Sequence, residues 1–174
     1  MKRIMIIGCC GAGKSTFARK LHSLTGIKVI YLDQQYFSPN WEEPQKDEWT
    51  KKVKNLVKAD QWIIDGNYGG TMNIRLERSD TIFYLKYTTL SCLYRVIKRV
   101  ITYHGTVRPN MAKGCKERFD LEFIHYVAVF NFVKGKSIEK RLKGISNDKK
   151  IIVLKNDKEV SNYIKHLEGS KSQR

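Results

Sequence analysis

Residues 8–16 read GCCGAGKST and match the pattern G-x-x-x-x-G-K-[ST] through Gly8, Gly13, Lys14 and Ser15. The apolar run 4–7 comes directly before the pattern, so the sequence predicts a strand, a glycine-rich turn and a helix in that order. Glycines give the turn backbone angles that other residues avoid, which lets its N–H groups point inward around phosphate oxygens. The segment therefore predicts a phosphate-binding loop, or P-loop.

The polar side chains of this loop supply what a nucleoside triphosphate needs. Lys14, which we expect to face solvent in an empty loop, adds positive charge at the β- and γ-phosphates, and the helix start adds its positive dipole end. The Ser15 hydroxyl can bind Mg²⁺. A chance loop of small residues is the alternative, but the complete pattern favours ATP and Mg²⁺. The predicted nucleotide contacts are Gly8, Gly11, Ala12, Gly13, Lys14, Ser15 and Thr16.

Length and composition favour one small domain. The chain has 174 residues, and we expect a single domain over residues 1–168 followed by a disordered tail over 169–174. Its four cysteines show neither metal-ligand spacing nor a disulfide framework, which predicts reduced thiols in a cytoplasmic protein. Residues 1–8 are too short for a signal peptide, and no apolar run approaches a membrane span.

The chain is strongly basic. It has 33 Lys and Arg against 17 Asp and Glu, a net charge of +16, which attracts polyanions such as nucleotides and nucleic acids. The excess of positive charge is concentrated in residues 86–118, which contain eight Lys and Arg residues and one acidic residue, Glu117. This segment either binds anions or forms a solvated basic face.

Apolar runs alternate with helical patterns along the chain. Strands are predicted over 4–7, 28–33, 62–65, 81–85 and 150–154, separated by segments with helical spacing. This order predicts an α/β three-layer sandwich, a five-stranded parallel sheet with helices on both faces. Ligands of such sheets bind at the carboxyl ends of the strands. The P-loop, Asp33 and Asp65 all fall at those ends.

A helical insertion lies between the fourth and fifth strands. In a helix over 88–103, an apolar stripe is expected to face the core, and Arg95 and Arg99 to point together from the opposite face; the stripe comprises Leu90, Leu93, Ile97, Val100 and Ile101. The next segment is predicted to be a mobile loop presenting Arg108 and Arg118. The helix over 119–133 is apolar nearly all round, which indicates burial or an oligomer interface.

Several of these segments together resemble the adenylate-kinase-like branch of P-loop kinases. Within that branch the chain is most similar to bacterial proteins labelled DNA topology modulation proteins. The resemblance spans most of the chain up to about residue 130 and rests on GCCGAGKST, YLD with the loop through Trp41, WIIDGNY, CLYRVIKR and RPNMAKGCKERFD. The label reflects a cellular effect on DNA topology, whereas the branch implies phosphoryl transfer from ATP.

The resemblance implies roles for individual residues. Asp65 matches the Asp of the D-G-F-P-R segment of nucleoside monophosphate kinases, which helps to hold Mg²⁺ through water. Arg95 and Arg99 match an R-x-x-x-R pair whose first member flanks the adenine and whose second reaches phosphates. That pair begins a lid, here residues 104–118, in which Arg118 is the best candidate for a phosphate-binding arginine, with Arg108 behind it. No zinc lid is expected, because Cys115 is the only thiol in this segment.

The acceptor side departs from the monophosphate kinases. The segment here reads DGNYGG, so the arginine that grips an acceptor monophosphate is absent, and only Arg75 and Arg78 lie nearby. Asp33, in LDQQYF, is similar to the strand-end Asp that takes the proton of an acceptor hydroxyl in nucleoside and other small-molecule kinases. A turn or helix-cap role is the alternative for Asp33. Tyr36, Trp41 and Tyr68 could line a base pocket or belong to the core.

Two functions are consistent with these observations. The first is an ATP- and Mg²⁺-dependent kinase acting on a nucleotide, nucleoside or similar metabolite, with catalytic roles for Lys14, Asp33, Arg95, Arg99 and Arg118. The second is a nucleotide-dependent nucleic-acid-binding protein that affects DNA topology. The sequence has no helix-turn-helix, zinc-finger or RNA-recognition signature, which favours the kinase.

Overall fold

A single five-stranded sheet organises the computed structural model, which describes residues 1–145 and 149–172. All its neighbouring strands run parallel, in the order β2-β3-β1-β4-β5. The predicted α/β fold with a five-stranded parallel sheet is confirmed. The strands are β1 (Arg3–Gly8), β2 (Val29–Tyr31), β3 (Trp62–Asp65), β4 (Thr81–Leu85) and β5 (Lys150–Leu154).

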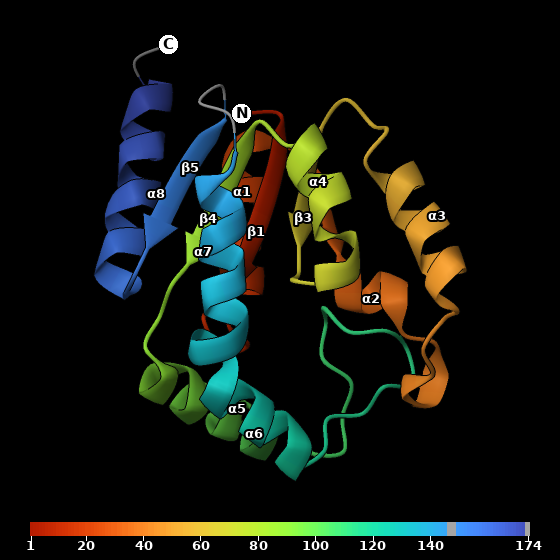
Figure 1. The fold of residues 1–174 in the computed structure, drawn as a ribbon. Coiled ribbons are helices and arrows are strands. Elements are labelled where there is room, and N and C mark those ends of the chain that lie inside the picture. Colours follow the sequence, from red (N-terminus) through yellow and green to blue (C-terminus); the bar gives the residue numbers. More distant parts are fainter. Residues whose placement is uncertain (146–148, 173–174) are drawn as a thin grey trace.

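Helices cover both faces of the sheet (Figure 1). One layer contains α1 (Lys14–Thr25) and α8 (Asp157–Ser172), and the other contains α4 (Met72–Arg78) and α7 (Lys136–Lys143). The helix α3 (Lys46–Leu56) lies outside α4, and the short α2 (Leu32–Tyr36) follows β2. The pair α5 (Thr89–Tyr103) and α6 (Leu121–Phe130) lies at the carboxyl end of the strands, next to the P-loop.

Local sequence signals account for several element boundaries. Helix α1 ends at Gly26, which adopts a left-handed φ of 74° and donates its N–H to the His22 carbonyl at 2.8 Å. Helix α6 begins after Asp120, whose carboxylate accepts the Phe123 N–H at 3.0 Å. The strands β1, β3 and β4 are almost wholly apolar because helices cover both faces of a parallel sheet.

Three boundaries differ from the prediction. Strand β2 ends at Tyr31, so Asp33 lies in the first turn of α2 rather than in a strand. The helix expected over 119–133 is α6, which continues through a π-helical turn, Asn131–Gly135, into α7. Helix α8 extends to Ser172, into the segment expected to be a disordered tail, and residues 173–174 lie outside the described part.

Helix α5 buries a face that only partly overlaps the expected one, since Val100 is buried and Leu93 packs against the core as predicted. Its buried residues are Cys92, Val96 and Val100, whereas Leu90 and Ile101, assigned to the core stripe, are 80% and 75% exposed. The inner face is less apolar because it packs closely on the P-loop, where a small side chain such as Cys92 fits. Arg95 and Arg99 are half-buried on this inner side.

The helix α6 is also only partly covered. Val127 and Phe130 are buried in the core, while Phe132 and Val133 in the following turn are 68% and 58% exposed. Burial, one of the two alternatives from the sequence, thus accounts for part of this segment, and the oligomer interface stays a prediction. Within residues 1–145 and 149–172, no helix is both long and apolar enough to cross a membrane.

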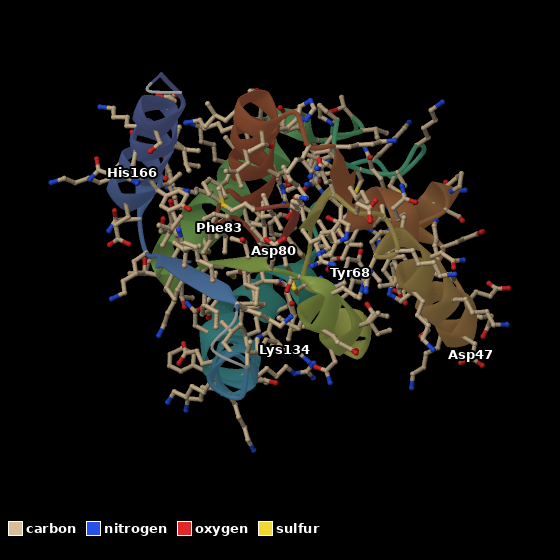
Figure 2. The ribbon with its side chains drawn as sticks, turned by 90° about the horizontal axis from the view of Figure 1, so that it is seen from above. Asp47, Tyr68, Asp80, Phe83, Lys134 and His166 are labelled. Atoms are coloured by element: carbon tan, nitrogen blue, oxygen red, sulfur yellow. The ribbon has the colours of Figure 1, made fainter. Side chains whose placement is uncertain are left out.

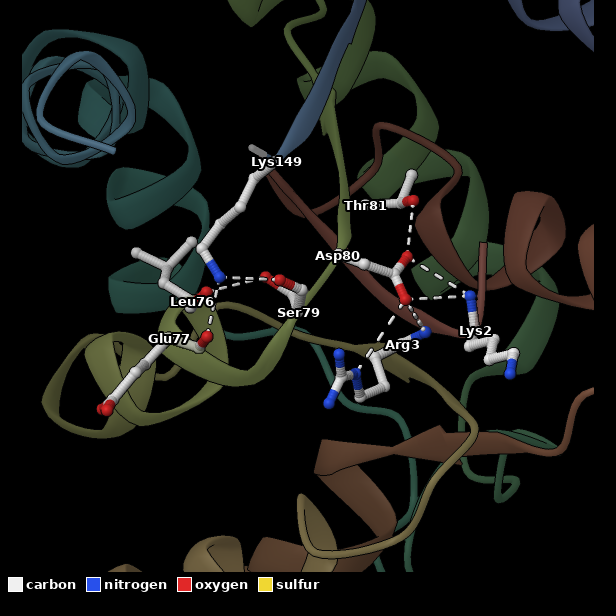
Figure 3. A network of polar contacts seen from close by, with 8 residues as sticks. All are labelled: Lys2, Arg3, Leu76, Glu77, Ser79, Asp80, Thr81 and Lys149. Atoms are coloured by element: carbon white, nitrogen blue, oxygen red, sulfur yellow. Dashed lines mark hydrogen bonds and ion pairs between the residues drawn. The ribbon is translucent and has the colours of Figure 1, made fainter. Parts of the chain in front are cut away.

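A polar network joins the amino ends of β1 and β4 (Figure 3). The Asp80 carboxylate accepts the backbone N–H groups of Lys2 and Arg3 at 3.0 and 2.8 Å and the Thr81 hydroxyl at 2.7 Å. Nearby, the Lys149 ammonium donates to two carbonyls at the end of α4. Burial opposes the charged form of Asp80, but these hydrogen bonds outweigh it and lower the pKa of the carboxyl.

We expect Asp80→Ala to lower the free energy of unfolding by about 1–3 kcal/mol at pH 7, because backbone donors lose a charged acceptor. A carboxyl whose pKa is lowered by folding stabilises above its unfolded pKa of about 4 and loses that contribution as the pH falls. Denaturant unfolding between pH 2 and pH 8 should therefore show the difference from wild type shrinking in acid. Asp60→Ala, at an exposed turn, is the control; a pH-independent difference would contradict the assignment.

Candidate nucleotide and phosphoryl-transfer site

The P-loop is in close contact with the end of β4 on one side and with α5 on the other. Gly8 has a φ of 144°, and a Cβ there would lie 2.4 Å from the Leu85 carbonyl oxygen. Gly11 has a φ of 85°, and a Cβ there would lie 2.4 Å from the carbonyl oxygen of Cys92. Both positions therefore require glycine for conformation and for space. The contact with Cys92 fixes the loop against the helix that carries Arg95 and Arg99.

Lys14 lies within the loop rather than facing solvent as expected. Its ammonium donates to the carbonyls of Gly8 and Cys9 at 2.9 and 3.0 Å, and the Asn67 amide bonds both backbone groups of Gly8. Burial opposes the charge on Lys14, but Cys10, Asp65 and Asp33 raise its pKa. Lys14 thus provides a fixed positive charge at the centre of the turn.

Ser15 and Asp65 lie together beside Lys14. The Ser15 hydroxyl donates to Asp65 Oδ2 at 2.5 Å, while Asp65 Oδ1 is buried without a hydrogen-bond partner in the described part of the chain. Burial raises the pKa of Asp65 to about 6, against the opposing effects of Lys14 and Ser15. A hydroxyl and a carboxylate with an unpaired buried oxygen fit a Mg²⁺ ion completed by phosphates and water.

Asp33 faces the site from α2. Its Oδ1 accepts the hydroxyl of Tyr68 at 2.8 Å, and burial together with Asp33 raises the pKa of that hydroxyl. The N-cap residue of α2 is Tyr31, and no side-chain capping bond is present there. The Asp33 carboxylate also contributes to the raised pKa of Lys14, after Cys10 and Asp65.

The predicted aromatic residues form two groups on this side of the site. Tyr36, Trp49 and Tyr68 contact one another, with ring centroids 4.7–5.2 Å apart. Trp41 instead packs against Phe37 and donates its ring N–H to the Lys116 carbonyl in the lid at 3.2 Å. Tyr36 and Tyr68 are therefore beside Asp33, whereas Trp41 supports the lid.

Arg75, one of two nearby arginines considered for an acceptor, is fully buried. Its guanidinium donates to the carbonyls of Gly66, Asn67 and Tyr68. Burial lowers the pKa of Arg75 to about 9, so it remains charged at neutral pH. Arg75 thus holds the turn after Asp65 in shape and is not free to bind a phosphate, while Arg78 is exposed at the end of α4.

Arg95 lies at the opposite side of the P-loop. It forms an ion pair with Asp157 at 2.5 Å and its guanidinium lies 4.8 Å from the ring centroid of Tyr87. The Tyr87 hydroxyl donates to the other Asp157 oxygen at 2.8 Å. These residues border a cavity of about 300 Å³ that is also lined by Ala12, Gly13, Thr16, Phe17, Lys20, Leu85, Val160 and Ser161.

Arg99 turns away from Arg95 toward the lid. Its Nη2 lies 2.9 Å from Oε1 of Glu117, and Arg108 Nε lies 2.6 Å from the other carboxylate oxygen. Arg118, the expected lid arginine, is 66% exposed and its guanidinium approaches Asp120 at 3.8 Å. The structure therefore brings Arg108, not Arg118, together with Arg99. The sequence alone did not reveal this, because it gives no partner for Glu117.

The lid is packed against α2 and the segment that follows it rather than projecting as a free loop. Gln34 donates to the Pro109 carbonyl at 2.7 Å, and Cys115 lies 3.2 Å from the Ser38 carbonyl. Asn110 reaches the P-loop and donates to the Ser15 hydroxyl at 3.0 Å.

The four histidines of the chain are all exposed, and His166 lies on the outer helix α8 in Figure 2.

Comparisons with known proteins define the fold further. A deoxyadenosine kinase from M. mycoides with dCMP and a flexible dCDP bound has a TM-score of 0.50 and 18% identity, covering 98% of this chain and 99% of that one. A structure of deoxyadenosine kinase from the same organism with dATP bound gives 0.48 and 17%, with 97% and 100% covered. At this identity the likeness shows a P-loop kinase fold. No family model and no curated protein sequence matches, so nothing there supports the resemblance to DNA topology modulation proteins.

We expect Asp65→Asn to reduce Mg²⁺-dependent turnover by about a hundredfold, because metal affinity falls without the carboxylate. Folding raises the pKa of Asp65 from 3.8 to about 6. Its ionisation therefore costs stability as the pH rises through this range, and the variant should be at least as stable as wild type above pH 6. Thermal unfolding and a Mg²⁺ titration of turnover test both parts. Asp60→Asn is the control, and unchanged Mg²⁺ dependence would remove Asp65 from the metal site.

Proposed function

We propose that this chain is an ATP- and Mg²⁺-dependent kinase that phosphorylates a hydroxyl group of a small molecule, with nucleosides as the first class to test. The observation that carries the proposal is the position of Asp33, whose carboxylate bonds the Tyr68 hydroxyl and lies within electrostatic reach of Lys14. A hydroxyl acceptor needs a group that takes its proton, and a positioned carboxylate can do so.

The residues on the acceptor side support a hydroxyl over a monophosphate. The buried Arg75 is committed to three backbone carbonyls, so its guanidinium is not available to an acceptor phosphate. Tyr36 and Tyr68 are half-buried on this side of the site and pack on the buried ring of Trp49. The deoxyadenosine kinase that shares the fold at a TM-score of 0.50 is named for a nucleoside, which agrees with this choice.

Phosphoryl transfer requires mainly positioning and electrostatic stabilisation, because charge spreads over the oxygens of the transferred group. The P-loop N–H groups and Lys14 would hold the β- and γ-phosphates, and Arg95 would border the base in the 300 Å³ cavity. Ser15 and Asp65 would hold Mg²⁺, which neutralises phosphate charge when bound. Arg99 and Arg108 would approach the γ-phosphoryl from the lid, and the packed lid would exclude water.

A nucleic-acid-binding function rests on the net charge of +16 alone. Any protein this basic binds DNA at low salt, so such binding does not separate the two functions. A screen of nucleosides, nucleoside monophosphates and sugars for ADP release is the direct test.

We expect Asp33→Asn to slow transfer to the identified acceptor by about a hundred- to ten-thousandfold, because the amide cannot take the hydroxyl proton. ATP affinity and thermal stability should change little, since Asn can still accept the bond from Tyr68. Turnover, ATP binding by calorimetry and thermal unfolding are measured together, with Asp60→Asn as the matched control. Wild-type turnover in the Asp33 variant would eliminate the base, and lost stability with normal turnover would indicate a structural role.

We expect Arg99→Ala to lower turnover on the order of a thousandfold, as for an arginine that stabilises the transferred phosphoryl. An arginine that only contacts a DNA backbone would instead lower the salt slope of DNA binding by about one counterion. The control is Arg118→Ala, an exposed lid arginine that should leave turnover near wild type. If Arg99→Ala keeps its turnover but lowers the salt slope, nucleic-acid binding becomes the better assignment.

A further inference from the structure

The lid contains one buried carboxylate, and two arginines converge on it. Glu117 is 3% exposed, and its Oε1 lies 2.9 Å from both Nε and Nη2 of Arg99. Its Oε2 lies 2.6 Å from Nε of Arg108, which comes from the opposite arm of the lid. Arg99 is further held over the Phe123 ring at 5.3 Å. The Glu117 carboxylate, near the end of the lid, thus links Arg99 on α5 to Arg108 near the start of the lid.

The backbone of Glu117 closes the same loop. Its N–H donates to the Thr106 carbonyl at 2.8 Å, and its carbonyl accepts the Gly105 N–H at 2.9 Å. Residues 105–117 therefore form a loop whose two ends are hydrogen-bonded to each other. The Glu117 side chain extends from this junction toward Arg99 and Arg108. This junction therefore fixes the two ends of the lid segment relative to each other.

The paired arginines lie close to the P-loop. Arg99 belongs to α5, whose Cys92 carbonyl oxygen would lie 2.4 Å from a Cβ at Gly11, and Asn110, two residues after Arg108, donates to the Ser15 hydroxyl at 3.0 Å. Both arginines also oppose the effect of burial on the pKa of the Cys10 thiol. Burial and the neighbouring Arg108 also lower the pKa of Arg99, which shows that the two cations oppose each other. Without an anion between them, two desolvated guanidiniums would separate.

We propose that Glu117 is a positioning residue that holds Arg99 and Arg108 side by side against the P-loop, so that both reach the phosphoryl group being transferred. This inference rests on the kinase function proposed above. Glu117 acts through the arginines and takes no proton from the substrate. Removing the Glu117 carboxylate would keep the positive charges of Arg99 and Arg108. The two guanidiniums would no longer be held in position, and the lid would no longer be held closed.

The test is Glu117→Gln, which keeps the shape of the side chain and removes its charge. We expect kcat to fall by about ten- to a hundredfold with little change in the KM for ATP, because misplacement by about 1 Å affects the transition state more than binding. Hydrogen exchange of residues 104–118 should accelerate, while exchange in β1 and β4 stays as in wild type. This second measurement does not require any kinase activity.

Glu139→Gln is the matched control, because it removes a carboxylate from an exposed ion pair with Lys86 at 2.7 Å on α7. It should leave both kcat and lid exchange unchanged. Wild-type kcat in Glu117→Gln would overturn the positioning role. A higher kcat or tighter ATP binding would also overturn it, because Glu117 would then compete with phosphate for the arginines.

A double variant distinguishes the loss of arginine positioning in Glu117→Gln from a general folding defect. Combining it with Arg108→Gln removes one of the two unpaired cations, and the loss caused by Glu117→Gln should be smaller in that background than in wild type. An equal loss in both backgrounds would show that Glu117 does not act through Arg108. If wild type phosphorylates no acceptor, the proposed function fails, whereas lid exchange still decides whether Glu117 holds the lid.

Discussion

The close contact between the P-loop and its two neighbours is the constraint on which the rest of the site depends. A side chain at Gly8 or Gly11 would meet a backbone carbonyl at 2.4 Å, from Leu85 on one side and Cys92 on the other. The loop is thus held between the end of β4 and the inner face of α5. Because α5 carries Arg95 and Arg99, one backbone contact sets the distance from the phosphate cradle to both arginines.

Charge balance then determines how the site remains stable without a ligand. Lys14, Arg99 and Arg108 bring positive charge into a half-buried space, where an uncompensated ion is costly. The carboxylates of Asp65, Asp33 and Glu117 are placed among them. The same arrangement suits a nucleotide, because phosphate oxygens can take over the contacts that the cations make with the protein.

The sequence predicted the sheet well because buried parallel strands are short apolar runs, and all five runs, from 4–7 to 150–154, form strands. It failed on the inner face of α5, because the larger side chains at Leu90 and Ile101 outweighed Cys92 in the apolar pattern although they are exposed. It selected Arg118 over Arg108 because charge alone does not show which guanidinium meets Glu117. Tertiary contacts decided both cases, and they leave no periodic signal.

Arg75 shows that a phosphate-binding arginine and a structural arginine can look the same in the sequence. An arginine near the DGNYGG turn could grip a phosphate, but here the turn has three carbonyls pointing inward, and the buried guanidinium bonds all of them. The turn holds Asn67 on the P-loop and Tyr68 on Asp33. Arg75 thus supports both the donor and the acceptor side through the backbone. In the kinase proposed above, the positive charge that a monophosphate would require is thus used to build the turn, and the acceptor would meet a carboxylate and aromatic rings instead.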